Sequence, residues 1–312
     1  MKATAILIQQ PKQIELAQLS IDDLVEGQIA VEIEYSGIST GTEKLLWSGK
    51  MPNFPGMGYP LVPGYESVGK VTEVTKNSNY QVGDTVFVPG AKCFGDVRGL
   101  FGGASSHVVV PQERVIQLDD KIGAEGVLLA LAATAYHATQ GMPENQPDLI
   151  VGHGVLGRLI ARIAVAKGKA PIVLETNSAR MAGAVGYQVI HPREQDVSQK
   201  YPIIMDASGD AGLINTLISQ LSMNGEIVLA GFYDQAISFM FAPAFMKEMR
   251  MRIASQWQPQ DLIAVKELID TRQLSLAGLI TNQSTPKDAQ SAYQTAFGDS
   301  NCLKMILDWR QK

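Results

Sequence analysis

The chain has 312 residues, and 26 Lys and Arg against 31 Asp and Glu give it a formal net charge of −5. This length is typical of about two domains. The composition, with 46% hydrophobic and 18% charged residues, excludes a disordered or fibrous chain. The mild acidity provides no basic face for nucleic acid and no polybasic segment for anionic lipid.

The cysteine content and the N-terminal sequence indicate a reducing compartment. Cys93 and Cys302 are too few for a four-cysteine zinc site or a disulfide framework. The apolar run at residues 3–8 is short for a signal peptide, and no small-residue cleavage site follows it. No stretch approaches the roughly 18 apolar residues that cross a bilayer. We therefore expect a cytoplasmic protein without an integral membrane segment.

The first third of the chain is rich in β-favouring runs separated by Gly, Pro, Asn and Asp. The irregular stretch 48–64 contains four prolines with glycines between them. Unstructured stretches of this length are usually functional. No long helical pattern occurs before about residue 126. Strands are predicted at residues 3–8, 29–35, 68–74, 85–88 and 107–110.

The middle third alternates short apolar runs with helical patterns, which predicts a parallel, doubly wound sheet. Beyond about residue 257 the pattern changes again and predicts two helices and a last strand. The predicted strands of the middle third are residues 149–151, 171–174, 203–206 and 226–230, and its helices are 156–163, 178–185 and 211–221. The later helices are 262–270 and 286–297, and the last strand is 302–308.

A glycine pattern, G-x-G-x-x-G, occupies residues 152–157, directly after a predicted strand and at the start of an amphipathic helix. Its first glycine permits a tight turn, its second lets backbone amides approach a pyrophosphate, and its third lets the helix pack against the sheet. Glu175 ends the next strand, where an acid receives ribose hydroxyls. Because a carboxylate repels a 2′-phosphate, NAD is predicted as the cofactor. Arg180 is expected either to contact adenine or to complicate the preference for NAD over NADP. His153 is expected to face solvent.

Ligands bind at the carboxyl ends of strands in doubly wound sheets. Residues that follow later strands of the middle third are therefore predicted to be cofactor neighbours. The predicted cofactor-binding set from these arguments is Gly152, Gly154, Val155, Leu156, Gly157, Glu175, Arg180, Ser208 and Gly231.

Six motifs follow one another in the order found in a known superfamily. They are P-G-Y-E-S-V-G at 63–69, V-G-D at 82–84, T-A-Y-H-A at 134–138, the glycine pattern at 152–157, D-A-S-G at 206–209 and G-E-I-V at 225–228. In these motifs the chain resembles the medium-chain dehydrogenase/reductase superfamily.

The resemblance implies an α/β protein with two domains. A GroES-like, β-rich catalytic domain comprises residues 1–126, and residues 258–312 form a C-terminal return to it. A doubly wound Rossmann domain for NAD comprises residues 127–257. The resemblance also implies that Thr134 contacts the nicotinamide.

Zinc-dependent members of the superfamily hold their catalytic ion with a Cys, a His, and a further Cys or acid. By the resemblance, these positions are Ser39, Tyr65 and Ala130 here. Ser and Tyr are poor zinc ligands, and Ala is none. Glu66 alone is retained, and the lobe that binds structural zinc is missing. We therefore predict no metal.

Residues 36–49 and 51–66 resemble a narrower branch of the superfamily that acts on chlorophyll-type pigments. This resemblance implies NAD-dependent oxidation of the 3-(1-hydroxyethyl) group of a (bacterio)chlorophyllide to a 3-acetyl group, in bacteriochlorophyll biosynthesis. The same region is aromatic, methionine-rich and stiffened by prolines, which suits a preformed wall for a flat tetrapyrrole. Packing between domains or subunits is the alternative. The predicted substrate wall is Trp47, Met51, Phe54, Met57 and Tyr59.

Oxidising a secondary alcohol without a metal requires positioning, hydrogen bonds and a proton acceptor. Ser39 and Thr40 are predicted to bind the substrate oxygen, and Tyr65 to donate or relay a proton. Glu66 is predicted to accept a proton if burial raises its pKa. The alternatives are a packed phenol for Tyr65 and, for Glu66, a structural acid paired with Arg or Lys from the Rossmann domain. Glu43 is a further acceptor candidate, although a structural or capping role suits it better.

Two other functions remain open on the sequence. One is a zinc-free quinone or enone reductase, or another NAD(P)-dependent alcohol dehydrogenase. Glu175 counts against the NADPH preference usual for such reductases. The other is a non-catalytic dinucleotide-binding assembly or sensor protein. Residues 252–255 resemble an edge strand that pairs across a two-fold axis in dimers of the superfamily, which favours a homodimer.

Overall fold

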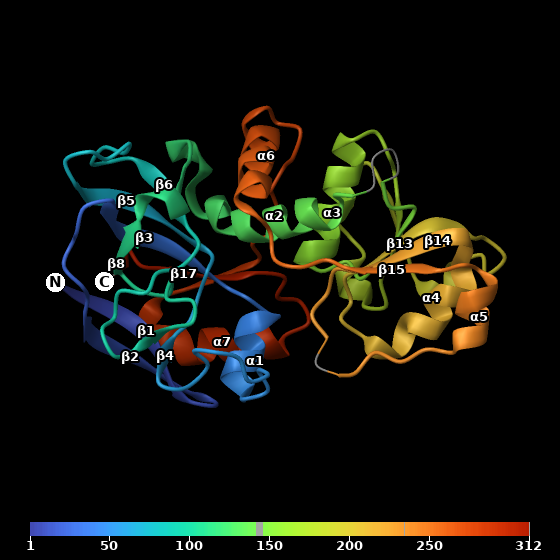
Figure 1. Ribbon diagram of the computed structural model, residues 1–312, viewed down its shortest axis with the longest axis horizontal. Helices are drawn as coiled ribbons and strands as arrows, with labels where there is room; N and C mark the ends of the chain where they lie inside the picture. The colour runs from blue at the N-terminus through green and yellow to red at the C-terminus, as the bar shows by residue number, and fades with distance from the viewer. Residues whose placement is uncertain (142–145, 234, 312) are drawn as a thin grey trace. The chain divides into compact units, whose positions relative to one another are not determined.

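The computed structural model describes residues 1–141, 146–233 and 235–311, and the chain forms two compact units. Unit 1 is Met1–Ala130 with Leu279–Lys312, and unit 2 is Leu131–Gly278. Both ends of the chain therefore belong to the same unit, and Figure 1 shows them near each other.

The return to unit 1 begins at Leu279, later than the expected residue 258. Helix α6 (Pro259–Asp270) belongs to unit 2 because polar contacts tie it and the turn after it to earlier helices. His137 Nδ1 lies 2.8 Å from Asp261 Oδ2, and Arg162 Nη1 donates to Ser275 O at 2.7 Å.

Unit 1 contains two sheets. The smaller has the strand order β2-β1-β4-β7, and the larger has the order β16-β17-β3-β5-β6-β9, with β8 paired to β3. The strands are β1 (Lys2–Gln10), β2 (Gln13–Ser20), β3 (Gln28–Ile38), β4 (Leu61–Val62), β5 (Ser67–Val74), β6 (Thr85–Val88), β7 (Arg98–Gly99), β8 (His107–Pro111), β9 (Ile116–Gln117), β16 (Asn282–Ser284) and β17 (Met305–Asp308). All five strands predicted for the first third are confirmed.

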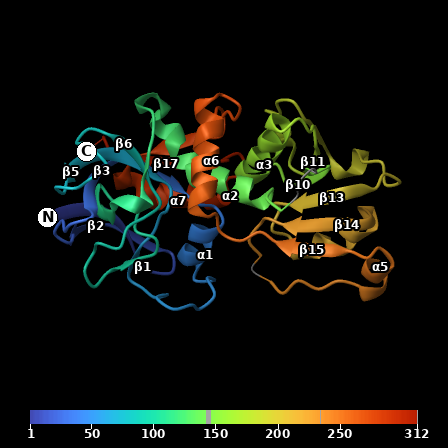
Figure 2. The same ribbon diagram turned by 45° about the horizontal axis from the view of Figure 1, so that its top comes forward.

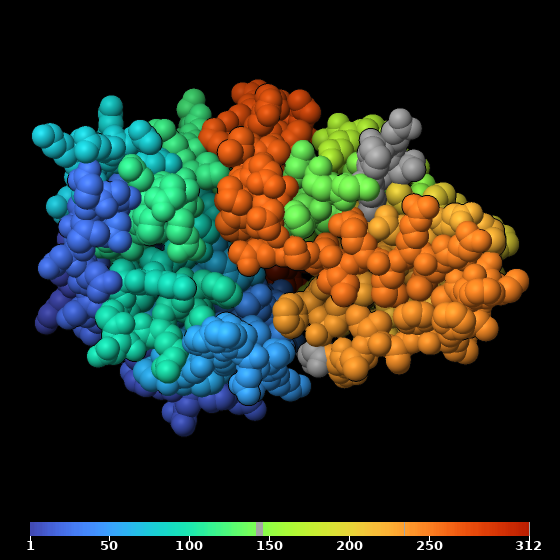
Figure 3. Space-filling model, in the orientation of Figure 1, coloured from blue at the N-terminus to red at the C-terminus, as the bar shows by residue number. Residues whose placement is uncertain are grey.

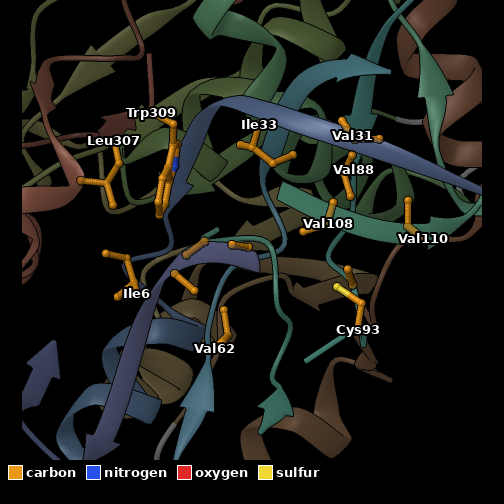
Figure 4. Close-up of a cluster of buried hydrophobic side chains, with 14 of the residues drawn as sticks. Ile6, Val31, Ile33, Val62, Val88, Cys93, Val108, Val110, Leu307 and Trp309 are labelled. Atoms are coloured by element: carbon orange, nitrogen blue, oxygen red, sulfur yellow. The ribbon is translucent and has the colours of Figure 1, made fainter. Parts of the chain in front are cut away.

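Short helices complete unit 1. They are α1 (Thr42–Ser48), the 3₁₀ helices η1 (Gln112–Arg114), η2 (Asp120–Leu128) and η6 (Pro286–Asp288), and α7 (Ala289–Gly298), while α2 (Leu129–Ala138) crosses the unit boundary. Between the two sheets lies one apolar core, to which strands from both chain ends contribute. Figure 4 shows part of it, with labelled side chains from β1, β3, β4, β6, β8 and β17 directed toward one another.

Unit 2 is a six-stranded parallel sheet, as predicted, with the strand order β12-β11-β10-β13-β14-β15. Figure 2 shows the labelled strands β11, β10, β13, β14 and β15 side by side in that order. The strands are β10 (Leu149–Val151), β11 (Ile172–Leu174), β12 (Gln188–Ile190), β13 (Tyr201–Asp206), β14 (Leu221–Leu229) and β15 (Arg250–Ile253). The helices besides α6 are α3 (Val155–Ala166), η3 (Ser178–Arg180), η4 (Pro192–Glu194), η5 (Ala211–Leu213), α4 (Ile214–Gln220) and α5 (Phe241–Met246).

The helix predicted at residues 178–185 is wrong, because the structure has only the single 3₁₀ turn η3 there. Two glycines later in this loop, Gly183 and Gly186, have φ angles of +86° and +78°. These angles are incompatible with a right-handed helix. The crossover between β11 and β12 is therefore an irregular loop, which needs side chains from elsewhere to fill the space of a helix.

No helix among the described residues combines the length and hydropathy that a bilayer crossing requires. Several exposed apolar side chains belong to the part of unit 2 that lies between β14 and α6 in the sequence, which Figure 3 draws mostly in orange. They belong mainly to α5 and to the strand β15. The exposed members are Phe239, Met240, Phe241, Phe245, Met246 and Ile253.

Candidate functional site

In the larger sheet of unit 1, the end of strand β3 lies beside the starts of its two antiparallel neighbours, β17 and β5. Strand β17 begins at Met305, which pairs with Ile38, the last residue of β3. On the other side of β3, Ser67 at the start of β5 pairs with Ser36. This register brings together the residues that flank the strand ends, which are Ser39, Glu66 and Lys304.

Glu66 and Lys304 form a buried ion pair. Lys304 Nζ lies 2.6 Å from Glu66 Oε2 and also donates to Ile38 O at 3.2 Å. The side chains of Lys304 and Glu66 are 2% and 0% exposed. The expected cation for Glu66 is therefore present, but it comes from the C-terminal segment of unit 1 and not from the Rossmann domain. Glu66 Oε1 is buried and has no hydrogen-bond partner among the described residues.

Gly37 makes room for this ion pair. A Cβ atom at Gly37 would lie 2.3 Å from Glu66 Oε2, well inside van der Waals contact. The backbone of Gly37 also donates a hydrogen bond to Glu66 O at 2.7 Å. Any larger residue at this position would have to displace the carboxylate.

Ser39 and Tyr65 form a hydroxyl pair beside the ion pair, with 2.7 Å between Ser39 Oγ and Tyr65 OH. The Tyr65 ring also packs edge-on against Phe101, with 5.5 Å between ring centroids. Burial raises the pKa of Tyr65 far above its usual range, and the charge of Glu66 adds to this effect. Tyr65 is therefore a neutral phenol at physiological pH. Thr40 follows Ser39 in the sequence and is exposed.

A second carboxylate, Glu43, lies in the first turn of α1 and is fully buried. Its Oε1 accepts a hydrogen bond from the Ser39 amide at 3.1 Å, and its Oε2 accepts one from the Tyr293 hydroxyl at 2.6 Å. Burial raises the pKa of Glu43 to about 7, against the lowering effect of these two hydrogen bonds. We call Ser39, Glu43, Tyr65, Glu66, Tyr293 and Lys304 the buried polar cluster.

Four of the five predicted wall residues lie together in unit 1. Each is half-buried and packs against a small apolar cluster that includes Leu46 and Leu61. Phe54 is outside this cluster and is 39% exposed. The four packed residues are Trp47, Met51, Met57 and Tyr59.

In unit 2, residues 152–157 form a turn between β10 and α3. Gly152 has φ of +94°, and a Cβ atom at Gly157 would lie 1.9 Å from Gly152 O. A Cβ at Gly154, by contrast, would meet no atom within 4 Å. No side chain caps the start of α3, and its first turn carries no acid. Free amides at a helix start and open space over Gly154 fit the pyrophosphate of a dinucleotide.

Glu175 directly follows β11, beside this turn, and is 8% exposed. Its Oε2 accepts a hydrogen bond from the His153 amide at 2.9 Å, and its Oε1 accepts one from the Asn177 amide at 2.8 Å. The carboxylate thus holds the glycine turn in place. Because a carboxylate has about four acceptor positions, it retains capacity for ribose hydroxyls.

His153 does not face solvent, contrary to expectation, because it helps to fill the loop between β11 and β12. It is fully buried, with Nδ1 2.6 Å from Arg180 O and Nε2 2.8 Å from the Tyr187 hydroxyl. Burial lowers the pKa of His153 to about 4, so the ring is neutral. Arg158 also donates to Arg180 O, at 2.8 Å. Both side chains thus hold the backbone of the loop between β11 and β12 at Arg180.

The remaining predicted cofactor residues lie at the ends of β13 and β14 or on α2. Ser208 is exposed, and its Oγ donates to Asp206 Oδ1 at 2.6 Å. A Cβ at Gly152 would lie 3.2 Å from Ser208 Cα, and one at Gly231 would lie 2.8 Å from Gly209 N. The backbone is therefore closely packed where the strands end. Thr134 is half-buried on α2.

Sequence reasoning missed two members of the buried polar cluster, Tyr293 and Lys304. Both lie more than 200 positions from their partners, with separations of 250 and 238 residues. A weak signal existed for Lys304, the one charged residue in the apolar run 302–307. Within the described ranges, no group of three His, Cys, Asp or Glu residues is arranged to hold a metal.

Comparison with known proteins identifies the family. The model of the alcohol dehydrogenase GroES-like domain matches residues 25–120. A 2-desacetyl-2-hydroxyethyl bacteriochlorophyllide A dehydrogenase from Rhodobacter capsulatus is 55% identical, with 99% of each chain covered. A protein of the same name from Cereibacter sphaeroides is 52% identical, again with 99% of each chain covered.

Solved structures share the fold at low sequence identity. L-idonate 5-dehydrogenase from Escherichia coli matches with a TM-score of 0.87 at 19% identity, with 99% of each chain covered. A short chain alcohol dehydrogenase from E. coli CFT073, solved with NADH, matches with a TM-score of 0.85 at 20% identity and the same coverage.

A GroES-like unit and a Rossmann unit with a complete glycine turn define an oxidoreductase of the alcohol dehydrogenase class that uses a nicotinamide cofactor. The chain belongs to the medium-chain dehydrogenase/reductase superfamily, in the family of its two full-length bacterial relatives.

Alanine at two glycines of the turn should separate cofactor binding from folding. Gly154→Ala adds a methyl group in open space, so we expect an unchanged melting temperature and NADH affinity weakened at least about tenfold, because the methyl group blocks the pyrophosphate. In Gly157→Ala the new methyl group would collide with Gly152 O, so both the melting temperature and the NADH affinity should fall. NADH fluorescence titration and thermal unfolding measure them. Unchanged NADH affinity in Gly154→Ala would contradict the site.

Removing the cation of the buried ion pair should destabilise unit 1. Lys304→Met leaves Glu66 buried without a counter-charge, and we expect a loss of about 3–5 kcal/mol in the free energy of unfolding. The double variant Glu66→Gln, Lys304→Met should recover most of this loss, because it removes both charges of the pair. Urea unfolding measures both. A Lys304→Met protein within about 0.5 kcal/mol of wild type would show that the pair is not formed.

Proposed function

We propose that this protein oxidises the 3-(1-hydroxyethyl) group of a (bacterio)chlorophyllide to a 3-acetyl group with NAD, in bacteriochlorophyll biosynthesis. The observation that carries the proposal is the full-length identity of 55% and 52% to two dehydrogenases named for a hydroxyethyl bacteriochlorophyllide. The reaction removes two hydrogens from a carbinol. Bound NAD supplies the hydride acceptor, and the chain must bind the carbinol oxygen and remove its proton.

The Ser39–Tyr65 pair is proposed to bind the carbinol oxygen. The two hydroxyls share one hydrogen bond, so one O–H proton remains for a further acceptor. Tyr65 is neutral, because burial raises its pKa. It therefore donates or relays a proton and does not act as a phenolate base. Thr40, exposed beside the pair, is proposed as a second hydrogen-bonding group.

Glu66 is proposed as the proton acceptor. Its Oε2 is occupied by Lys304, whereas its Oε1 is buried and accepts no hydrogen bond from the described residues. A proton taken up there would meet no competing donor. Lys304 would hold the carboxylate in position during the transfer.

The residues present do not suit a catalytic zinc ion, and we propose catalysis without one. Two of the three positions that would supply ligands hold Ser39 and Tyr65, which hydrogen-bond each other. The third holds Ala130, and the adjacent Glu66 is committed to Lys304. A conjugated macrocycle can share the positive charge that develops at the carbinol carbon, which reduces the need for a Lewis acid.

Glu175 supports NAD as the cofactor over NADP. Its carboxylate stands at the end of β11, the position at which an acid receives the ribose hydroxyls. A 2′-phosphate would be repelled there. The proposed contacts with the dinucleotide are those of Gly152, Gly154, Val155, Leu156, Gly157, Glu175, Arg180, Ser208 and Gly231, with Thr134 at the nicotinamide.

The tetrapyrrole is proposed to contact the wall residues of unit 1. Trp47, Met51, Met57 and Tyr59 pack on one apolar cluster, and Phe54 keeps 39% of its surface exposed. A hydrogen bond from the Tyr59 hydroxyl to Leu46 O ties the wall to α1, the helix that carries Glu43. The wall is thereby linked to the buried polar cluster.

A homodimer through unit 2 is also proposed. Strand β15 is the last strand of the sheet and pairs, within the described residues, only with β14. Ile253 on this strand is 73% exposed, and the exposed phenylalanines and methionines of residues 239–246 lie next to it in sequence. An unpaired edge beside apolar surface favours pairing with a second copy about a two-fold axis.

Incubation of the purified protein with a 3-(1-hydroxyethyl) chlorophyllide tests the function. We expect NADH formation equal to the pigment converted, with a shift in pigment absorption, and at least about tenfold higher kcat/KM with NAD than with NADP, because Glu175 repels the 2′-phosphate. Chelation should leave the rate unchanged. The Gly154→Ala variant is the control for contaminating activity.

Other outcomes of that assay identify the alternatives. Consumption of NADPH with a quinone or enone, without pigment oxidation, would support a reductase. Tight NADH binding without turnover of any substrate would support a non-catalytic binding protein. Loss of activity on chelation, with one zinc ion per chain, would overturn catalysis without metal.

Tyr65→Phe removes one hydroxyl of the pair and keeps the ring on Phe101. We expect kcat to fall by about 10²–10⁴-fold, the range for loss of a positioned proton donor, with NADH affinity unchanged. Tyr80→Phe is the matched control, because that hydroxyl binds Val115 O elsewhere in unit 1. Full activity in Tyr65→Phe would remove Tyr65 from the mechanism.

A charge on the sheet edge should dissociate the proposed dimer. Ile253→Glu places a carboxylate within the apolar edge, so we expect the dimer mass to become that of a monomer in light scattering, with the melting temperature of unit 2 retained. Ile263→Glu, exposed on α6, is the control and should remain dimeric. A monomeric wild-type protein at micromolar concentration would contradict the proposal.

A further inference from the structure

The buried polar cluster contains a second carboxylate that has no cation. Glu43 is fully buried, and no Lys, Arg or His among the described residues forms an ion pair with it. Lys304, the neighbouring cation, contacts Glu66 instead. Burying an unpaired carboxylate is strongly unfavourable. Perturbed, costly charges of this kind concentrate where they serve function.

The hydrogen bonds of Glu43 connect the start of α1 to a distant helix. Its Oε1 accepts from the Ser39 amide at 3.1 Å, and its Oε2 accepts from the Tyr293 hydroxyl at 2.6 Å. Tyr293 is fully buried on α7 and packs edge-on against Phe297. An ordinary capping acid would serve only its own helix. Glu43 instead joins the backbone of Ser39 to a rigid residue from the other end of the chain.

These contacts fit a positioning role and not a proton relay. Glu43 meets Ser39 at the backbone amide, which carries no transferable proton. The Ser39 hydroxyl contacts Tyr65, on the other side of the residue. Movement of the amide by a few tenths of an ångström would nevertheless move the hydroxyl by a similar amount. In catalysis by positioning, small displacements of a reacting group strongly affect the rate.

We propose that Glu43 is a positioning residue. By linking the Ser39 amide to the Tyr293 hydroxyl, it keeps the Ser39 hydroxyl in hydrogen-bonding contact with Tyr65. The inference rests on the proposed function of the Ser39–Tyr65 pair and adds to it the groups that fix its geometry. The ionised carboxylate accepts from both donors, whereas a protonated Glu43 keeps only one strong acceptor oxygen, so the positioning is stronger in the charged form.

Because the positioning depends on charge, activity and stability should change in opposite directions as pH rises. The groups that face Glu43 are the Ser39 amide, Tyr293, Glu66 and Lys304. Burial raises its pKa from 4.5 to about 7 in the folded protein. The folded state therefore binds the proton more tightly than the unfolded state, and the contribution to stability is lost as pH rises through 7. Activity, which needs the ionised form, should increase over the same range.

Glu43→Gln tests the proposal, because glutamine keeps the size of the side chain and removes its charge. Above pH 7 we expect kcat to fall at least about tenfold, with KM for NAD unchanged and with a melting temperature no lower than that of wild type. The decline of wild-type kcat below about pH 7 should be absent in this variant. If Glu43 served stability alone, Glu43→Gln would have a lower melting temperature than wild type and the same dependence of kcat on pH.

Tyr293→Phe provides a second, independent readout. Its hydroxyl stabilises the ionised form of Glu43, so its removal should move the acid limb of the kcat profile to higher pH. Glu113→Gln, an exposed glutamate on η1, is the matched control and should reproduce the wild-type profile.

The results separate failure of the inference from failure of the proposed function. A wild-type protein that does not oxidise the pigment overturns the function. An active wild type with unchanged kcat and pH profile in Glu43→Gln overturns the inference. Melting temperatures across pH need no substrate, and equal pH dependence in wild type and Glu43→Gln would also overturn it, because the charge would then be absent.

Discussion

The pairing of β3 with β5 on one side and β17 on the other is the constraint on which unit 1 depends. It connects residues near 38, 66 and 304, and a single-residue slip in either ladder would send these side chains to the opposite face of the sheet. The ion pair of Glu66 with Lys304 closes this junction. Because the pair joins the two ends of the chain, the N-terminal segment cannot assemble its polar cluster without the C-terminal one.

Two buried carboxylates in this junction are treated differently. Glu66 has a cation at 2.6 Å, whereas Glu43 has only two hydrogen-bond donors, and its pKa rises to about 7. Ser39 contacts Glu43 through its amide and neutral Tyr65 through its hydroxyl. Such an arrangement is poor for stability, because hydrophobic residues would pack there at lower free energy. The proposed metal-free oxidation would use these hydroxyls to bind the alcohol and a carboxylate to accept its proton.

Unit 2 shows how a binding turn can be supported from within. The described crossover between β11 and β12 has a 3₁₀ turn and no α-helix, and the buried His153 forms hydrogen bonds there with Arg180 O and the Tyr187 hydroxyl. Glu175 holds the same turn through the His153 amide. The glycine turn therefore keeps its shape through contacts of the chain itself, and the uncapped start of α3 remains available to an anion.

The sequence by itself determined the α/β class, the parallel sheet and the glycine turn, because periodicity and glycine placement act over a few residues. It also indicated the superfamily, because six motifs follow one another in the order found in that superfamily. Only the tertiary structure decided that Glu66 meets Lys304, that Glu43 meets Tyr293, and that residues 178–185 form no α-helix. Strand register and burial bring together residues more than 200 positions apart, and local patterns carry no information about either.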